Sequence, residues 1–136
     1  MLAALSSCTM DQAKMKQESR DLLTRLNAIE DETSFEKRQK MLDELAALKL
    51  EDRSNEHARE VCLSAHVQLL RAEVEQATAK KQLEEADKGP GQPKLAPDGA
   101  KDVSAAIQRS NDALEEAQKT LPACEVSMQT LIARSR

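Results

Sequence analysis

Apolar residues recur along this chain at intervals of three and four, the spacing that places them on one face of an α-helix. The pattern predicts three helices, over residues 10–31, 34–87 and 98–134. The first stretch carries its apolar face on Met15, Leu22, Leu23, Leu26 and Ile29. The last alternates steps of four and three over more than four turns, which is typical of a helix packed along its length against another.

Turn signals separate the three stretches. Asp31 to Ser34 interrupts the first pattern, and Thr33 followed by Glu36 matches a capping box that would start the second helix. The Gly and Pro residues of the segment 88–97 end it, so we expect a turn there. Residues 34–87 are predicted to form one continuous helix. A bend at Ser54 and Asn55, which would give a compact three-helix bundle, is the alternative.

The register of the two long helices follows from the cysteines. Cys62 and Cys124 are equidistant from residue 93, inside the predicted turn. An antiparallel hairpin with this midpoint would also place Gln76 opposite Ser110, as a polar layer that fixes the register. Most of the apolar layers join a small residue to a large one: Ala79 with Ile107, Ala72 with Leu114, Leu69 with Ala117, Ala65 with Leu121, and Ala58 with Met128. One layer, Leu83 with Val103, joins two large residues.

The first helix is predicted to fold back on the second about the turn at 31–34. This pairing sets Leu22 opposite Leu45 and Leu26 opposite Met41. The fold class expected is therefore all-α, an elongated, coiled-coil-like antiparallel helical hairpin with an additional N-terminal helix. Residues 9–136 would form a single domain.

Composition excludes several functions. The 20 basic and 24 acidic residues are interspersed, and the chain has no Trp or Tyr and one Phe, so no nucleic-acid-binding surface is predicted. The sequence has no phosphate-binding Gly loop and no Gly-x-Ser-x-Gly turn. We therefore expect a protein that is not an enzyme, with no catalytic residues, no cofactor, no bound metal and no small-molecule substrate.

A disulfide between Cys62 and Cys124 is predicted, because both fall in one layer of the hairpin. It would close a loop of 61 residues and stabilise the fold by about 4 kcal/mol on the chain-entropy model. Such a bond implies an oxidising compartment. Two buried free thiols are the alternative. A third hypothesis gathers Cys62, His66, Cys124 and Met128 around a soft metal, although His66, like His57, is expected at the surface.

The third cysteine ends the string Leu5-Ser6-Ser7-Cys8, which resembles the lipobox of bacterial lipoproteins. The resemblance implies a diacylglyceryl group on Cys8, export to the periplasm and anchoring in a membrane; Thr9 in place of Asp is compatible with outer-membrane sorting. Residues 1–8 would then be a truncated signal, because Met1 to Leu5 supplies neither a basic start nor a full apolar stretch. A frayed helical N-terminus is the alternative.

These observations favour a non-enzymatic cell-envelope lipoprotein, lipid-anchored to the outer membrane, that acts as a helical spacer or protein-docking module. Its partners would be envelope proteins. If the first helix leaves them uncovered, the partner-binding residues are Leu42, Leu45, Leu48 and Leu50. The first alternative is a cytosolic coiled-coil adaptor or secretion chaperone. The second alternative is a metal-binding or thiol-redox protein.

Overall fold

The computed structural model describes residues 2–86 and 97–136, and the side chains of residues 12–86 and 99–136. The described residues contain helices and no strand, which confirms the all-α class. The helices are α1 (Leu2–Asp31), α2 (Phe35–Ala47), α3 (Arg53–Ala86) and α4 (Pro97–Arg134). The predicted count of three helices is wrong, because the stretch 34–87 forms two. Apart from Pro97, the predicted turn at 88–97 lies outside the described residues.

The break between α2 and α3 is held by contacts from distant residues. Arg59 of α3 donates hydrogen bonds to the main-chain oxygens of Leu45, Ala46 and Leu48, so one guanidinium satisfies carbonyl groups at the end of α2. Asp52 caps α3, since its carboxylate accepts from the N–H of Asn55 at 3.0 Å. The predicted continuous helix is therefore wrong. The alternative bend at Ser54 and Asn55 lies close to the observed break at 48–52, but four helices form instead of the three it implied.

Ser34 starts α2. Its side chain accepts a hydrogen bond from the N–H of Lys37, as an N-cap residue does. The predicted capping box of Thr33 and Glu36 is therefore wrong, because the N-cap is Ser34 and its N–H bonds to Glu32. The N–H groups of Thr33 and Ser34 instead donate to the carboxylate of Glu32. This side chain completes the tight turn between α1 and α2.

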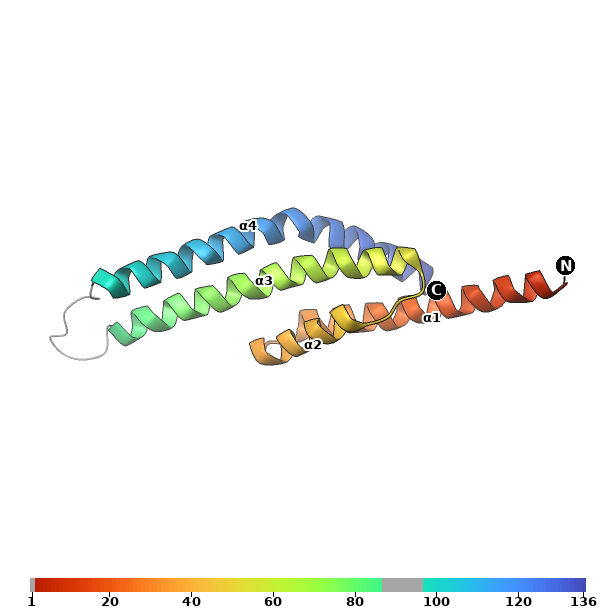
Figure 1. The fold of residues 1–136 in the computed structure, drawn as a ribbon, viewed down its shortest axis with the longest axis horizontal. Coiled ribbons are helices and arrows are strands. Elements are labelled where there is room, and N and C mark those ends of the chain that lie inside the picture. Colours follow the sequence, from red (N-terminus) through yellow and green to blue (C-terminus); the bar gives the residue numbers. More distant parts are fainter. Residues whose placement is uncertain (1, 87–96) are drawn as a thin grey trace.

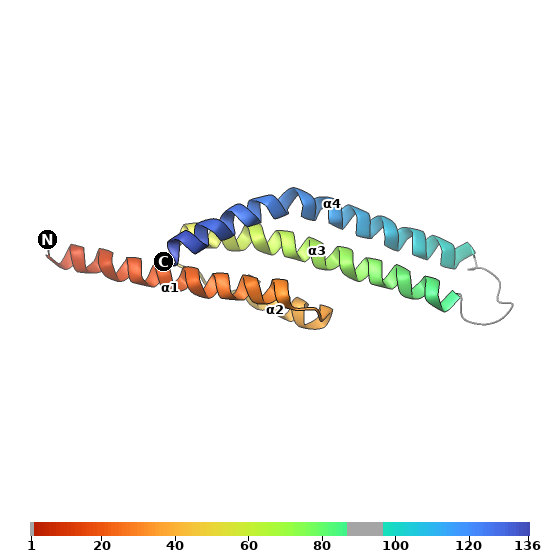
Figure 2. The same ribbon diagram turned by 180° about the vertical axis from the view of Figure 1, so that it is seen from behind.

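Each helix runs antiparallel to the next along the chain (Figures 1 and 2). The short hairpin of α1 and α2 lies against only one end of the long hairpin of α3 and α4. We call the four-helix end the base. We call the two-helix remainder, residues 74–86 of α3 and 99–114 of α4, the arm. The N-terminal end of α1 and the tip of the arm lie at opposite ends of the molecule.

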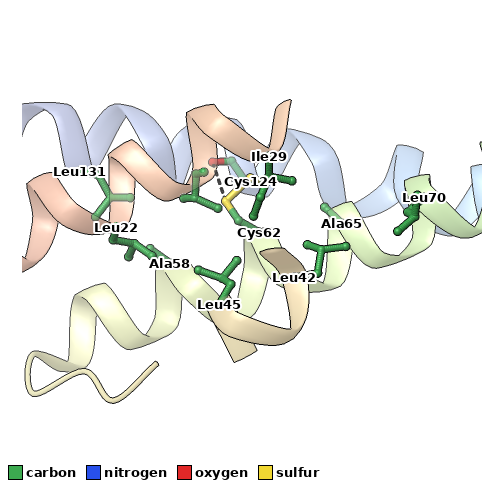
Figure 3. Close-up of a cluster of buried hydrophobic side chains, with 11 residues drawn as sticks. Leu22, Ile29, Leu42, Leu45, Ala58, Cys62, Ala65, Leu70, Cys124 and Leu131 are labelled. Carbon is green, nitrogen blue, oxygen red and sulfur yellow. Dashed lines mark hydrogen bonds between the residues drawn. A yellow bond between two sulfur atoms is a disulfide. The ribbon is translucent and has the colours of Figure 1, made fainter. Parts of the chain in front are cut away.

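The core sits in the base, where all four helices contribute apolar side chains (Figure 3). Leu22 and Leu45, which the sequence pairs across the first turn, are both fully buried, Leu26 is buried, and Met41 packs against the same cluster. The buried members of this cluster are Leu22, Leu26, Ile29, Leu42, Leu45, Ala58, Cys62, Ala65, Leu70, Cys124 and Leu131. Folding α2 back on α3 is what buries its leucines.

In the arm, the contact between α3 and α4, which we call the seam, is made mainly of small residues. Ala79, Val103 and Ala106 form its buried cluster, and the hydroxyl of Ser110 donates to the main-chain oxygen of Ala72 at 2.8 Å. The predicted layer of Gln76 and Ser110 is wrong, because Gln76 is exposed and Ser110 bonds one helical turn earlier on α3. Buried alanines allow the two helix axes to approach closely.

The seam also differs from prediction on α4, where two large residues lie outside it. Ile107 and Leu114 are 45% and 40% exposed, whereas their neighbours Ala106 and Ala113 are buried. Leu83 at the end of α3 is likewise 45% exposed. Val103, Ala117 and Cys124 are buried at their predicted positions, whereas Ala106 and Ala113 take the places predicted for Ile107 and Leu114. Within α4, the helix continues through Pro122 rather than starting again there.

Candidate functional site

A disulfide joins α3 to α4 at the centre of the base (Figure 3). The Sγ atoms of Cys62 and Cys124 lie 2.06 Å apart, so the pairing predicted from the hairpin register is present. Both residues are buried within the core cluster. Their sulfur atoms are therefore bonded to each other and hidden from solvent, which protects the bond from soluble thiols.

The proposed soft-metal set does not form. Two of its four members, Cys62 and Cys124, are bonded to each other, so neither offers a thiolate. Met128 packs against the core cluster. Among the residues that the structure describes, no three His, Cys, Asp or Glu side chains are grouped as a metal ion would require.

The predicted partner-binding leucines belong to the core instead. Leu42 and Leu45 are buried, and Leu48 and Leu50 are partly buried against the same cluster. The prediction is wrong because it depended on the first helix leaving them free. In the structure both α1 and α3 pack against α2, so these side chains hold the base together.

Cys8 lies within α1, and its side chain, with those of the rest of the lipobox-like string, is outside the described residues. Among the described residues, no helix combines the length and the apolar character needed to cross a membrane.

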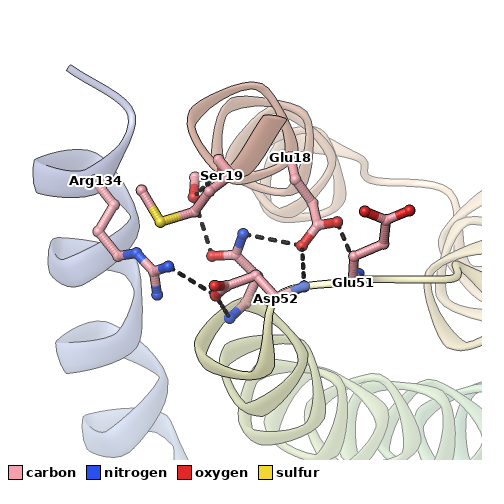
Figure 4. A network of polar contacts seen from close by, with 7 residues as sticks. Glu18, Ser19, Glu51, Asp52 and Arg134 are labelled. Atoms are coloured by element: carbon pink, nitrogen blue, oxygen red, sulfur yellow. Dashed lines mark hydrogen bonds and ion pairs between the residues drawn. The ribbon is translucent and has the colours of Figure 1, made fainter. Parts of the chain in front are cut away.

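One end of the base is closed by a polar network between α1, the α2–α3 loop and the end of α4 (Figure 4). The hydroxyl of Ser19 donates to Asn55 Oδ1 at 3.0 Å, and Asn55 Nδ2 donates to Glu18 at 3.1 Å. Glu18 also accepts from the N–H groups of Glu51 and Asp52. Ser19 and Asn55 are fully buried, so this network fixes how α1 and α3 meet.

An ion pair completes the network, with Arg134 Nη2 2.7 Å from a carboxylate oxygen of Asp52. Burial acts to raise the pKa of Asp52, but hydrogen bonds from the N–H of Asn55 and from Arg134, with the charge of Arg134, lower it below its ordinary value of 3.8. The carboxylate therefore stays charged at neutral pH and ties the C-terminal end of α4 to the start of α3.

The opposite end of the base contains a buried histidine. His66 is 3% exposed, which corrects the expectation of a surface position, while His57 is exposed as expected. The Nε2 atom of His66 makes no hydrogen bond and lies 3.9 Å from Glu30 Oε1. Burial, with a smaller effect of the nearby Arg38 charge, lowers the pKa of His66 below 6.5. His66 is therefore neutral at pH 7.

A shallow pocket of about 510 Å³ lies beside His66, where the α1–α2 turn meets α3 and α4. Arg38, largely buried, forms an ion pair with Glu73 across it. Phe35, Leu69 and Leu121 supply apolar walls. Glu30, Glu32 and Thr33 supply the rest of its polar lining.

No family model matches the chain, and neither a curated protein nor a solved structure is significantly similar to it. Function is therefore inferred from the sequence and from the geometry of the base and the arm. The sequence located the disulfide but missed the buried His66 and the exposed apolar residues of the arm. The one available signal for His66 was its position one helical turn after Cys62, on the same side of α3.

Proposed function

We propose that this protein is a non-enzymatic structural protein of the cell envelope, a lipid-anchored helical spacer whose arm docks other proteins. The observation that carries the proposal is the division of the molecule into a disulfide-bonded base and a projecting arm. A base with a buried core and a covalent link is a rigid support. An arm with exposed apolar residues supplies a surface for contacts between proteins.

The positions of the two ends support a spacer. A lipid on Cys8 would anchor the N-terminal part of α1, and the arm tip lies at the other end of the molecule (Figure 1). With 38 residues, α4 alone extends for about 57 Å at about 1.5 Å per residue. The molecule would thus hold its docking surface several nanometres from the lipid.

The buried disulfide supports a location in the periplasm. Structural disulfides persist in oxidising environments such as the periplasm and are rare in the cytosol. Its position at the centre of the core, joining the two longest helices, suits a bond that maintains structure. A location in the cell envelope would account for both the disulfide and the lipobox-like string.

The intact mass of the protein from its native host, before and after reduction with thiol alkylation, tests this proposal. We expect a chain that begins at Cys8, carries acyl mass and exposes two thiols only after reduction. Cys8→Ser should move the protein out of the membrane fraction, while the Cys62→Ala/Cys124→Ala control should stay there. An unprocessed chain with three alkylatable thiols would instead favour the cytosolic adaptor or secretion chaperone.

A further inference from the structure

The pocket beside His66 contains a buried nitrogen atom without a hydrogen-bond partner. His66 is 3% exposed, and its Nε2 atom bonds to none of the described residues. An unpaired buried polar atom costs free energy, so native proteins supply nearly every such atom with a partner. The pocket volume, about 510 Å³, is within the range of ligand sites. A ligand with a complementary polar group would satisfy Nε2.

The polar group nearest to Nε2 across the pocket is the carboxylate of Glu30, whose Oε1 atom lies 3.9 Å away. This distance is too long for a hydrogen bond, in which the heavy atoms are about 2.7–3.2 Å apart. A ligand atom about 2.9 Å from both would bridge them. Because the Glu30 side chain is 47% exposed, it can rotate to admit such an atom from the pocket side.

The bridging group must donate to both atoms. An ionised carboxylate only accepts hydrogen bonds, and a neutral imidazole accepts at one of its two nitrogens. Burial lowers the pKa of His66, so the ring is neutral at pH 7. In the tautomer that carries the proton on Nδ1, the acceptor is Nε2. A primary ammonium has three N–H donors on one nitrogen and therefore fits the gap.

The charges that line the pocket also favour a cation. Three carboxylates, those of Glu30, Glu32 and Glu73, outnumber one guanidinium, which leaves a net charge of −2. The guanidinium of Arg38 is already paired with Glu73. The carboxylate of Glu32 already accepts from two main-chain N–H groups. No described Lys or Arg pairs with Glu30, so a ligand cation would compensate its charge.

Apolar side chains beside these charges suit a hydrocarbon stem. Leu69 and Leu121 line the pocket together with Phe35, the only aromatic residue of the chain. Phe35 is 38% exposed and lies outside the core cluster. The face of an aromatic ring attracts a cation within about 6 Å of its centre. A ligand that carries ammonium groups on an alkyl chain would contact all of these surfaces.

We propose that this pocket binds a linear aliphatic diamine. Its two positive charges match the net charge of the lining. One ammonium would bridge Glu30 and the Nε2 atom of His66, and the methylene chain would lie against Leu69 and Leu121. The inference uses only the base, so it does not depend on the lipid, on the compartment or on the docking role of the arm.

Isothermal titration calorimetry of the oxidised Cys8→Ser chain with diaminopentane, which has one amine at each end, tests the site. We expect one ligand per chain with a Kd below about 1 mM, measured in about 0.1 M salt to screen loose attraction to the surface. Glu30→Gln should weaken binding at least about tenfold, because it removes a charged acceptor. Glu125→Gln is the matched control: Glu125 is exposed on α4 away from the pocket, so its substitution should leave the Kd unchanged.

Two analogues test the assigned chemistry. Pentylamine has the same stem and one ammonium, like a lysine side chain, and should bind at least about tenfold more weakly. Diaminopentane with three methyl groups on each nitrogen keeps both charges but has no N–H, so it should lose at least about tenfold as well. Equal binding of pentylamine would overturn the assignment to a diamine, and equal binding of the methylated analogue would overturn the bridge to His66. A parent chain without saturable binding below about 1 mM, or equal effects of Glu30→Gln and Glu125→Gln, would overturn the site itself.

Discussion

The base and the arm use the same two helices but are stabilised differently. In the base, α3 and α4 bury fully enclosed leucines and a disulfide beneath α1 and α2. In the arm they meet through alanines and a hydroxyl bond, and large apolar residues remain outside the seam. A periodic apolar pattern therefore predicts that two helices pack together. The amount of surface that they bury depends on whether further helices cover them.

Removal of the disulfide should give the largest loss of stability. We expect Cys62→Ala/Cys124→Ala to lower the free energy of unfolding by about 4 kcal/mol, because the bond closes a long loop in the unfolded chain. Urea denaturation monitored by circular dichroism measures this change. Cys8→Ser is the control, which should leave the midpoint unchanged. An unfolding midpoint insensitive to the double substitution would mean that the base does not depend on its covalent link.

A matched pair of leucine truncations tests the contrast in packing directly. Leu45→Ala, in the base, should cost about 3 kcal/mol, because it opens a cavity in an enclosed core. Leu83→Ala, in the arm, should cost less than about 1 kcal/mol, because nearly half of that side chain is already in water. Both values come from the same urea experiment. Equal losses would show that the arm is packed as tightly as the base.

The hydrogen bonds of the base and the arm can be compared in the same way, with smaller expected losses of stability. Asn55→Ala should cost about 2 kcal/mol, because it removes two side-chain hydrogen bonds from the buried network, one with the Ser19 hydroxyl and one with Glu18. The Ser19 hydroxyl would keep its bond to the main-chain oxygen of Met15. Ser110→Ala should cost about 1 kcal/mol, since the helix supplies the Ala72 carbonyl with another hydrogen bond. Thermal unfolding of the two variants beside the parent protein ranks them. The reverse order would contradict the role assigned to the network in the base.

Much of the α3–α4 hairpin could be predicted from the sequence, because one antiparallel register relates distant residues by simple arithmetic. The cysteine pairing followed from that register. The residues at the α3–α4 contact could not all be predicted. The periodic pattern favoured the large Ile107 and Leu114 as contact residues, whereas Ala106 and Ala113 are the buried ones, because small side chains let the two helix axes approach closely. A single-sequence pattern contains no measure of the distance between helices.

The break after Ala47 had no strong local signal, because no Gly or Pro lies in the segment 48–52. Contacts from Arg59 and Glu18, both remote in sequence, satisfy the main-chain groups there. The break also lets α2 pack against α3 as well as against α1, so Leu42 and Leu45 are buried in the base.

The last expected effect depends on pH and compares two histidines. The pKa of His66 is lowered in the folded protein, so below pH 6.5 the unfolded chain binds a proton that the folded base does not. Stability should therefore fall as the pH drops from 7.5 to 5, by at most about 1.4 kcal/mol per pH unit below 6.5. His66→Gln should remove this dependence, and His57→Gln, at an exposed site, should keep it. Urea titrations at several pH values measure the slope. If His66→Gln retained it, the proton would bind elsewhere, and the unpaired Nε2 beside Glu30 would not be the group that makes the base sensitive to acid.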